Sequence, residues 1–152
     1  MDAMRPTSLP KALLALNLLV CASTLGCGRK GDPLPRVRQG ARAPKVRWLS
    51  LRRLEITLPA QDLDGQDLVG LEQLRVLWLP IRMARPTPQE VFAQGEVALE
   101  RRRPDLAKPG ATFQLDLTTL NRPAGWLVVV AVRSGEVPGQ PSEVLTWLDP
   151  SL

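Results

Sequence analysis

The hydrophobic residues from about position 46 onward occur in short runs interspersed with polar residues. The alternation is most regular at residues 54–58, where it predicts a β-strand with one buried side and one side in water. The side chains expected inside are Leu54, Ile56 and Leu58, and those expected in water are Arg53, Glu55 and Thr57. Residues 46–49 predict a strand just before this one.

Five later stretches also predict strands: residues 74–79, 96–102, 112–117, 126–132 and 142–148. In the third of them Phe113, Leu115 and Leu117 are expected inside. The fourth is apolar and rich in β-branched residues, which predicts a central strand buried on both faces. A Gly/Pro-rich turn is expected between the last two. Short apolar runs separated by turn residues favour an all-β sandwich over a helical bundle.

Three segments between the strands contain charged or capping residues. Residues 62–67 (DLDGQD) combine carboxylates with glycine; because the bidentate glutamate of a calcium loop is absent, we expect a turn and no metal. Residues 87–90 (TPQE) have the form of a capping box with proline at the first helical position, which predicts a short helix. Arg101, Arg102 and Arg103 predict a solvated loop next to Pro104, with a phosphate site as the alternative.

The first 26 residues have a different pattern, which is typical of a secretory signal. Arg5 and Lys11 precede an apolar run at residues 12–20, which is broken only by Asn17, and small residues lead up to Gly26. The run is shorter than the roughly 20 residues that a membrane-spanning helix needs. We therefore predict a signal peptide over residues 1–26 with cleavage between Gly26 and Cys27. The alternative is an ordinary signal peptide with an incidental cysteine.

Residues 23–28 (STLGCG) resemble the lipobox of bacterial lipoproteins, in which a small residue precedes an acylated cysteine. The resemblance implies that Cys27 becomes the mature N-terminus and carries an S-diacylglycerol and an N-acyl chain. Each buried methylene contributes about 0.8 kcal/mol, so several chains make a lasting anchor. Because Gly28 and not aspartate follows the cysteine, the resemblance implies a periplasm-facing protein held in the lipid of the outer membrane.

Residues 27–45 are predicted to form a basic tether rich in proline and glycine. Its first part, CGRKGDPLP, resembles the CGxKGxP opening of a family of small envelope lipoproteins, which includes a chaperone of the lipopolysaccharide translocon. The resemblance implies a docking peptide as one role, and a plain extended spacer is the other. The residues concerned are Gly28, Arg29, Lys30, Gly31, Pro33 and Pro35.

The 152-residue chain has a formal net charge of +5, and the charge is unevenly distributed. Residues 29–53 contain one acidic residue, Asp32, and nine basic ones: Arg29, Lys30, Arg36, Arg38, Arg42, Lys45, Arg47, Arg52 and Arg53. We expect this segment to be a solvated tether; contact with anionic lipid headgroups or lipopolysaccharide phosphates after export is the alternative. Neither a recognition helix nor stacking aromatics accompany the charge, so we expect no nucleic-acid partner.

Residues 46–149 resemble a fibronectin type III domain. The features that carry the resemblance are Leu120, Pro123 and Trp126, the valines at 128, 130 and 132, and the segment Pro141-Ser142-Glu143. Leu120 and Trp126 keep the interval that separates a leucine from the tyrosine corner in that family. The resemblance implies an immunoglobulin-like β-sandwich behind the tether.

The chemistry available to this domain is narrow. The chain has no histidine and no tyrosine, and its two cysteines are Cys21 and Cys27. The commonest general base and thiolate nucleophile are therefore missing from residues 46–149, and no pair of carboxylates marks a glycosidase site. We expect a non-enzymatic adaptor without a cofactor, whose partner is another envelope protein. Trp78 and Trp147 are candidates either for the partner-facing surface or for the core.

Overall fold

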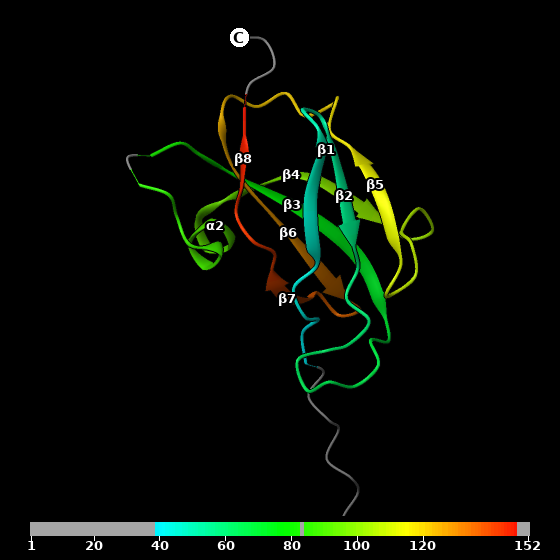
Figure 1. Cartoon of the computed structure of the whole chain (residues 1–152). Coiled ribbons are helices and arrows are strands. Elements are labelled where there is room, and N and C mark those ends of the chain that lie inside the picture. The colour runs from blue at the N-terminus through cyan, green and yellow to red at the C-terminus, as the bar shows by residue number, and fades with distance from the viewer. Residues whose placement is uncertain (1–38, 83, 149–152) are drawn as a thin grey trace, which may run out of the picture. The chain divides into compact units, whose positions relative to one another are not determined.

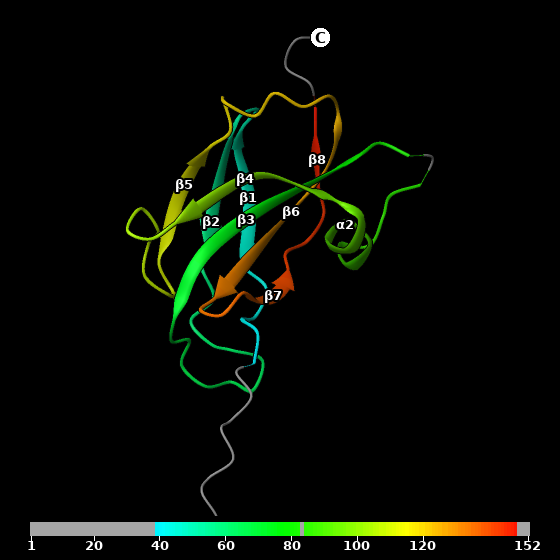
Figure 2. The same ribbon diagram turned by 180° about the vertical axis from the view of Figure 1, so that it is seen from behind.

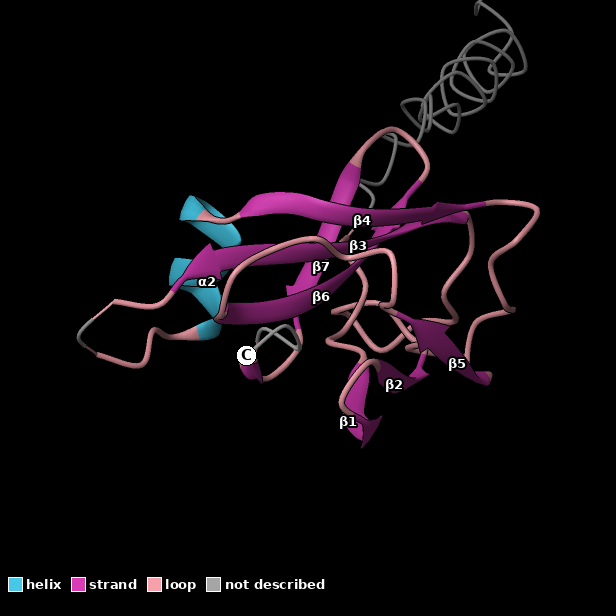
Figure 3. Cartoon of the chain, turned by 90° about the horizontal axis from the view of Figure 1, so that it is seen from above, coloured by secondary structure: helices cyan, strands magenta, loops and turns pink. Residues whose placement is uncertain are grey.

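The computed structural model describes residues 39–82 and 84–148, which form two antiparallel β-sheets packed face to face (Figures 1 and 3). The smaller sheet has the order β1-β2-β5, with bounds Lys45–Ser50, Arg53–Thr57 and Thr112–Asp116. In β2, Leu54 and Ile56 are fully buried while Arg53 is exposed. The alternation in the sequence therefore predicted the burial of this strand correctly.

The larger sheet has the order β4-β3-β6-β7, and β8 also pairs with β6. Its strands are β3 (Leu71–Pro80), β4 (Glu96–Arg102), β6 (Gly125–Arg133), β7 (Val137–Pro141) and β8 (Leu145–Trp147). One edge of β6 pairs with β3 along its whole length, whereas the other edge pairs with β8 near Gly125 and with β7 near Arg133. The viewpoint of Figure 2 shows this sheet from the side opposite to that of Figure 1.

The main core fills the space between the two sheets. Leu54 and Leu115 of the smaller sheet meet Leu74, Leu127 and Val129 of the larger one, and all are buried. Burying a side chain of this size contributes about 1.5–3 kcal/mol, so this layer supplies most of the driving force for folding. No disulfide is available to the described residues, because both cysteines precede residue 28.

A second, smaller core covers the outer face of the larger sheet. The alternate residues of β6, Val128, Val130 and Val132, pack there with Val91 of the helix α2 (Pro88–Gln94). Strand β6 is thus buried on both faces, as its apolar sequence predicted. The helix begins with the predicted capping box, in which the Thr87 N–H donates to Glu90 Oε2 at 2.6 Å and the Glu90 N–H donates to Thr87 Oγ1 at 3.3 Å.

The end of the chain differs from the sequence prediction. The segment expected to be a Gly/Pro turn continues as β7, and the strand expected at residues 142–148 is reduced to β8. Proline is tolerated in β7 because this strand lies at the edge of the sheet. At the break between β7 and β8, the Ser142 side chain takes over pairing, since the Val129 N–H donates to Ser142 Oγ at 2.9 Å.

Two further predictions are corrected. Arg101 and Arg102 belong to β4 and only Arg103 follows it, so the basic cluster is not a loop, although all three side chains are exposed. Residues 39–44, which the sequence placed in the tether, pack against the sandwich: the Gln140 N–H donates to Ala41 O at 2.8 Å, and Ala41 is fully buried. The packed domain therefore includes residues before position 46.

Candidate functional site

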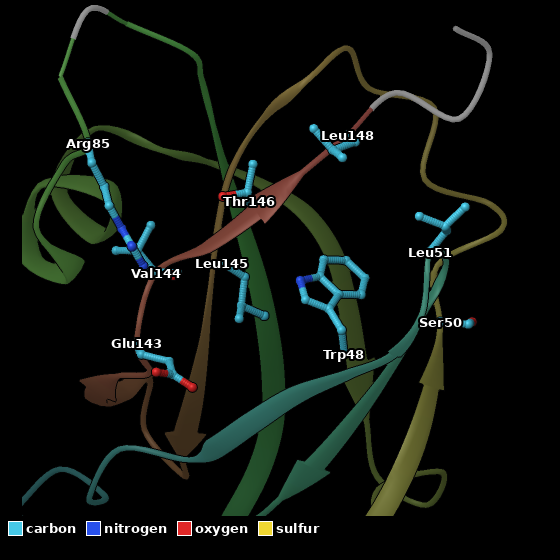
Figure 4. Close-up of a pocket in the computed structure, with 9 residues that line it drawn as sticks. All are labelled: Trp48, Ser50, Leu51, Arg85, Glu143, Val144, Leu145, Thr146 and Leu148. Atoms are coloured by element: carbon cyan, nitrogen blue, oxygen red, sulfur yellow. Dashed lines mark hydrogen bonds between the residues drawn. The ribbon is translucent and has the colours of Figure 1, made fainter.

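An open groove lies between β1 and β8, where an edge of one sheet faces an edge of the other (Figure 4). Strand β1 is the outermost strand of the smaller sheet, and β8 has no neighbour beyond β6. The hollow between them has a volume of about 430 Å³. Its size lies within the range of pockets that bind small ligands or several protein side chains.

The floor of the groove is aromatic. Trp48 of β1 stacks on Trp147 of β8 with 6.2 Å between ring centroids and 28° between ring planes. Trp147 is fully buried, and its Nε1–H donates to Arg122 O at 2.9 Å, which fixes the ring. Trp48 is only half-buried, so one part of its ring remains available to whatever occupies the groove.

The rim of the groove is apolar and exposed. Leu51 is 76% exposed and Leu148 is 59% exposed, and both line the hollow. Single exposed leucines are common on protein surfaces, but neighbouring ones that border a hollow mark a candidate interaction surface. The hydrophobic part of the groove thus runs from Trp48 to the end of β8.

The free edge of β8 carries backbone hydrogen-bonding groups that point away from β6. Arg85 Nη2 donates to Val144 O at 2.7 Å, which shows that the Val144 carbonyl faces this edge. Because backbone groups alternate in direction along a strand, the N–H and C=O of Thr146 face the same way. The register agrees, since Leu145 and Trp147 lie opposite Leu127 and Gly125 of β6.

Two opposite charges mark one end of the groove. Arg85 and Glu143 both line it, and neither takes part in an ion pair within residues 39–82 and 84–148. The other lining residues, among them Trp48, Leu51, Thr146 and Leu148, are uncharged. The groove therefore has no net charge from its lining residues, in contrast to the basic chain as a whole.

A smaller hollow of about 310 Å³ lies beside α2 and is bordered by Arg82, Gln94 and Trp126. Arg82 Nη1 donates to Gln94 Oε1 at 2.9 Å across it. Trp126 Nε1 is buried and has no hydrogen-bond partner within the described part of the chain. Trp126 also belongs to the outer core, so its indole does not make the bond of a tyrosine corner.

The two tryptophans that the sequence offered as partner-facing candidates belong to the core. Trp78 is 7% exposed and donates from Nε1 to Pro123 O at 3.1 Å, while the Arg122 guanidinium lies 5.1 Å from the centre of its ring. Trp78 and Trp147, which donate to the carbonyls of Pro123 and Arg122, together fix residues 122–123. Both indoles therefore hold a loop of the sandwich in place, and both rings lie in the core.

The predicted lipidation and tether residues, Gly26 to Pro35, lie outside the described residues. Of the basic segment, two members within the described part have partners: Arg47 Nε donates to Glu55 Oε1 at 2.5 Å and Arg42 Nε donates to Asp62 O at 3.2 Å. The hydrogen bonds to Glu55 raise the pKa of Arg47 above its ordinary value. These two cations are thus already engaged within the sandwich.

The predicted turn at residues 62–67 is present, and Asp62 organises it. Asp62 Oδ1 accepts the N–H groups of Asp64 at 3.1 Å and Gln66 at 2.9 Å. Gly65 adopts a φ of 80°, a conformation that favours glycine. The carboxylates of this turn form no metal-binding cluster: within residues 39–82 and 84–148 there is no group of three metal-ligating side chains.

Asp62 also contacts a buried arginine that attaches residues 39–42 to the sandwich. Arg133 Nη1 donates to Gln39 O at 2.5 Å and lies 3.5 Å from Asp62 Oδ2, and Arg133 Nε donates to Val69 O at 2.9 Å. The Arg133 and Asp62 side chains are only 9% and 10% exposed. We call residues 39–42 the leading segment.

Sequence reasoning missed the groove itself. It placed Trp48 in the first strand without a further role, and it did not single out Leu51 or Leu148. The available signal was that residues 48–51 (WLSL) remain apolar where a turn between two strands would ordinarily be polar. The pairing of β8 with β6, which brings Leu148 near Leu51, has no local signature.

No helix among the described residues is long and apolar enough to cross a membrane. Comparisons with protein-family models, with curated proteins and with solved structures found no match for this chain.

Proposed function

We propose that this chain is a lipid-anchored envelope protein, acylated at Cys27, whose β-sandwich acts as a non-enzymatic binding module at the outer membrane. The observation that carries the proposal is the leader, in which two basic residues, an apolar run and small residues precede Cys27 in that order. The lipid anchor confines the module to a surface. The packed domain beginning near Gln39 then presents its groove to a partner in the periplasm.

The topology supports assigning the sandwich to the fibronectin type III type. The connections from β2 to β3, from β4 to β5 and from β5 to β6 all cross from one sheet to the other. Crossing connections of this kind are typical of immunoglobulin-like sandwiches. The departure from that type is Trp126, which faces the outer core where a tyrosine corner would bind the backbone.

A binding role fits the chemistry of the groove better than catalysis does. Its lining offers apolar side chains, two hydroxyls, one guanidinium and one carboxylate. No pair of groups there has the arrangement of a nucleophile and its base, or of two facing carboxylates. Apolar contacts and free backbone groups are the means by which adaptor domains hold partners.

The anchor is tested by metabolic labelling with an alkyne fatty acid, followed by fractionation of the envelope. The wild-type chain is expected to incorporate label and to co-sediment with the outer membrane, whereas Cys27→Ala loses both properties. Cys21→Ala is the matched control, because it removes the other cysteine of the leader and should keep the label. Unlabelled wild-type protein in the soluble periplasm would refute the proposal.

The alternative role, a translocon-assisting factor that acts through its tether, is favoured by the residues CGRKGDP at positions 27–33. Photocrosslinking from the tether and from Leu148 separates the two roles. If the sandwich carries binding, the partner crosslinks to Leu148 and is still recovered when Lys30 and Gly31 are replaced. Recovery of the same partner by a lipidated chain that lacks residues 46–152 would assign binding to the tether.

A further inference from the structure

We propose that the groove between β1 and β8 binds an extended, uncharged apolar segment of a partner protein, which adds as a strand to the free edge of β8. This inference deepens the proposed adaptor function, because it names the chemistry of the partner and the site that receives it. Strand addition is a common mode of peptide recognition in which backbone hydrogen bonds give affinity and side-chain pockets give specificity.

The backbone of β8 argues for a strand. The outward Val144 carbonyl already has a donor in Arg85, whereas the outward N–H and C=O of Thr146 have no hydrogen bond outside the ladder with β6 in the described part of the chain. Thr146 is exposed, so a peptide backbone has access to these groups. An added strand would supply one donor and one acceptor at this position.

The side chains around this edge argue for apolar partner residues. In a strand added beside β8, alternate side chains would point toward the sandwich. There they would meet the half-buried ring of Trp48 and the exposed side chains of Leu51 and Leu148. The 430 Å³ of the hollow are available for these side chains.

The charges argue for a neutral segment. Arg85 and Glu143 stand at the same end of the groove, so their opposite charges leave no net charge there to favour a basic or an acidic peptide. Beyond them, the groove-lining residues on this side, from Val144 to Leu148, are uncharged. A charged residue in the middle of the partner segment would lose water without gaining a counter-ion.

The same chemistry argues against a fatty acyl chain as the occupant. Hydrocarbon would satisfy the apolar rim, but it would cover the N–H and C=O of Thr146 without replacing their bonds to water. An unsatisfied buried polar group costs about 1–3 kcal/mol. A peptide strand covers the same leucines and satisfies both groups, so it is the better complement to this site.

The test uses the full-length chain carrying Cys27→Ala, kept in mild detergent, and a displayed library of random ten-residue peptides. Peptides enriched on this protein are expected to be uncharged and to alternate apolar side chains. The best peptide is then synthesised, and its Kd is measured from the change in tryptophan fluorescence. Binding should also slow hydrogen exchange at the Thr146 amide.

Two changes isolate the backbone contribution, and a third variant serves as the control. Thr146→Pro removes an outward N–H that is not part of the ladder with β6, and methylating alternate amide nitrogens of the peptide removes its donors; each should weaken binding about tenfold or more. Val97→Lys is the matched control, because Val97 is a 49% exposed apolar residue of β4 away from the groove, and its Kd should not change. Circular dichroism confirms that each variant is folded.

Leu148→Lys provides a second variant if Thr146→Pro does not fold, and it should weaken binding by a similar factor. The proposal is overturned if no peptide is enriched, if the enriched peptides bind the groove variants as well as the control, or if the methylated peptide binds equally well. Displacement of the peptide by palmitate at lower concentration than by unlabelled peptide would assign the groove to lipid. Because the protein used here carries no acyl chain, these outcomes are independent of the labelling experiment on Cys27.

Discussion

Replacing Arg133 with methionine should release the leading segment from the sandwich. The guanidinium donates to the carbonyls of Gln39 and Val69 and lies 3.5 Å from the Asp62 carboxylate. The Arg133 and Asp62 side chains are about nine-tenths buried. Methionine has a similar length but no donor. Two partly buried hydrogen bonds to carbonyls and one contact with a buried carboxylate would therefore be lost.

The magnitude follows from the number and kind of bonds lost. A hydrogen bond to a charged group contributes about 1.5–3 kcal/mol, and removing one partner of a buried ion pair costs about 3–5 kcal/mol. Asp62 keeps the N–H bonds from Asp64 and Gln66, which reduces the cost of its lost partner. We therefore expect Arg133→Met to lower the free energy of unfolding by about 3 kcal/mol, a large part of the 5–15 kcal/mol that is usual for a domain.

The assay is urea unfolding followed by circular dichroism, together with hydrogen exchange of the amides that hold the leading segment. The Leu63 N–H donates to Gly40 O and the Gln140 N–H donates to Ala41 O, so both should exchange faster in the variant, while amides between β3 and β6 are affected only through global stability. Arg75→Met is the control. Arg75 also pairs with two carboxylates, but its side chain is 26% exposed, and we expect a loss of less than about 1 kcal/mol. Equal losses in the two variants, or unchanged exchange at Leu63 and Gln140, would refute the reasoning.

Three other predictions follow from the described contacts. Trp147→Phe removes the donor to the Arg122 carbonyl and should lower the free energy of unfolding, measured by chemical denaturation, by about 1–3 kcal/mol. Trp126→Phe removes an indole N–H that has no partner in the described residues and should lower it by less. The opposite order would contradict the assigned bonds. Gly139→Ala places a Cβ 2.5 Å from Ala41 O and 2.9 Å from Ala131 O, so the melting temperature should fall clearly. An unchanged melting temperature would show that β7 can shift away from residues 39–42 at no cost. Hydrogen bonds from Arg75 and Gln73 lower the pKa of Glu136, and a hydrogen bond from Arg102 lowers the pKa of Glu100. The stability that these carboxylates contribute should therefore be complete well above pH 4.5 and be lost as the pH falls through the lowered pKa values. If the melting temperature of Glu136→Gln declines with pH as the wild type does, Glu136 is not part of the explanation.

The parts of the fold that were predictable are those with a local signal. Residues 54–58 alternate because their strand is buried on one face, and β6 is continuously apolar because it is buried on both faces. Each pattern therefore predicted the burial of its strand directly. The capping box before α2 is likewise a local arrangement, because Thr87 and Glu90 bond to each other's backbone. None of these predictions required knowledge of distant contacts.

The parts that were missed depend on contacts between distant segments. Strand β7 contains two prolines and a glycine, and its sequence is typical of a turn. It forms a strand because Gly139 allows close approach to Ala41, about a hundred positions earlier in the chain, and because the edge of β6 is open there. The burial of Trp147 depends in the same way on the carbonyl of Arg122 and the ring of Trp48.

The attachment of the leading segment and the groove lie at opposite ends of one strand. Arg133, at the end of β6, holds the leading segment, and residues 125–127, at its beginning, pair with β8 beside the groove. Figures 1 and 2 show the start of the described chain at one end of the sandwich and the turn between β1 and β2 at the other. The nine residues of β6 span about 30 Å, and β3 pairs with all of them.

This arrangement has a mechanical consequence for an anchored adaptor. Part of a pull between the proposed anchor and a strand bound to β8 would pass through the bonds of Arg133, along β6 and across the ladder to β8, while the rest would enter β1 through the covalent chain. Within β6 that load is borne along the covalent backbone, so the first bonds to yield should be those at its two ends. The buried contacts of Arg133 therefore strengthen the attachment on the anchor side, whereas the three-residue β8 would set the force at which the partner is released.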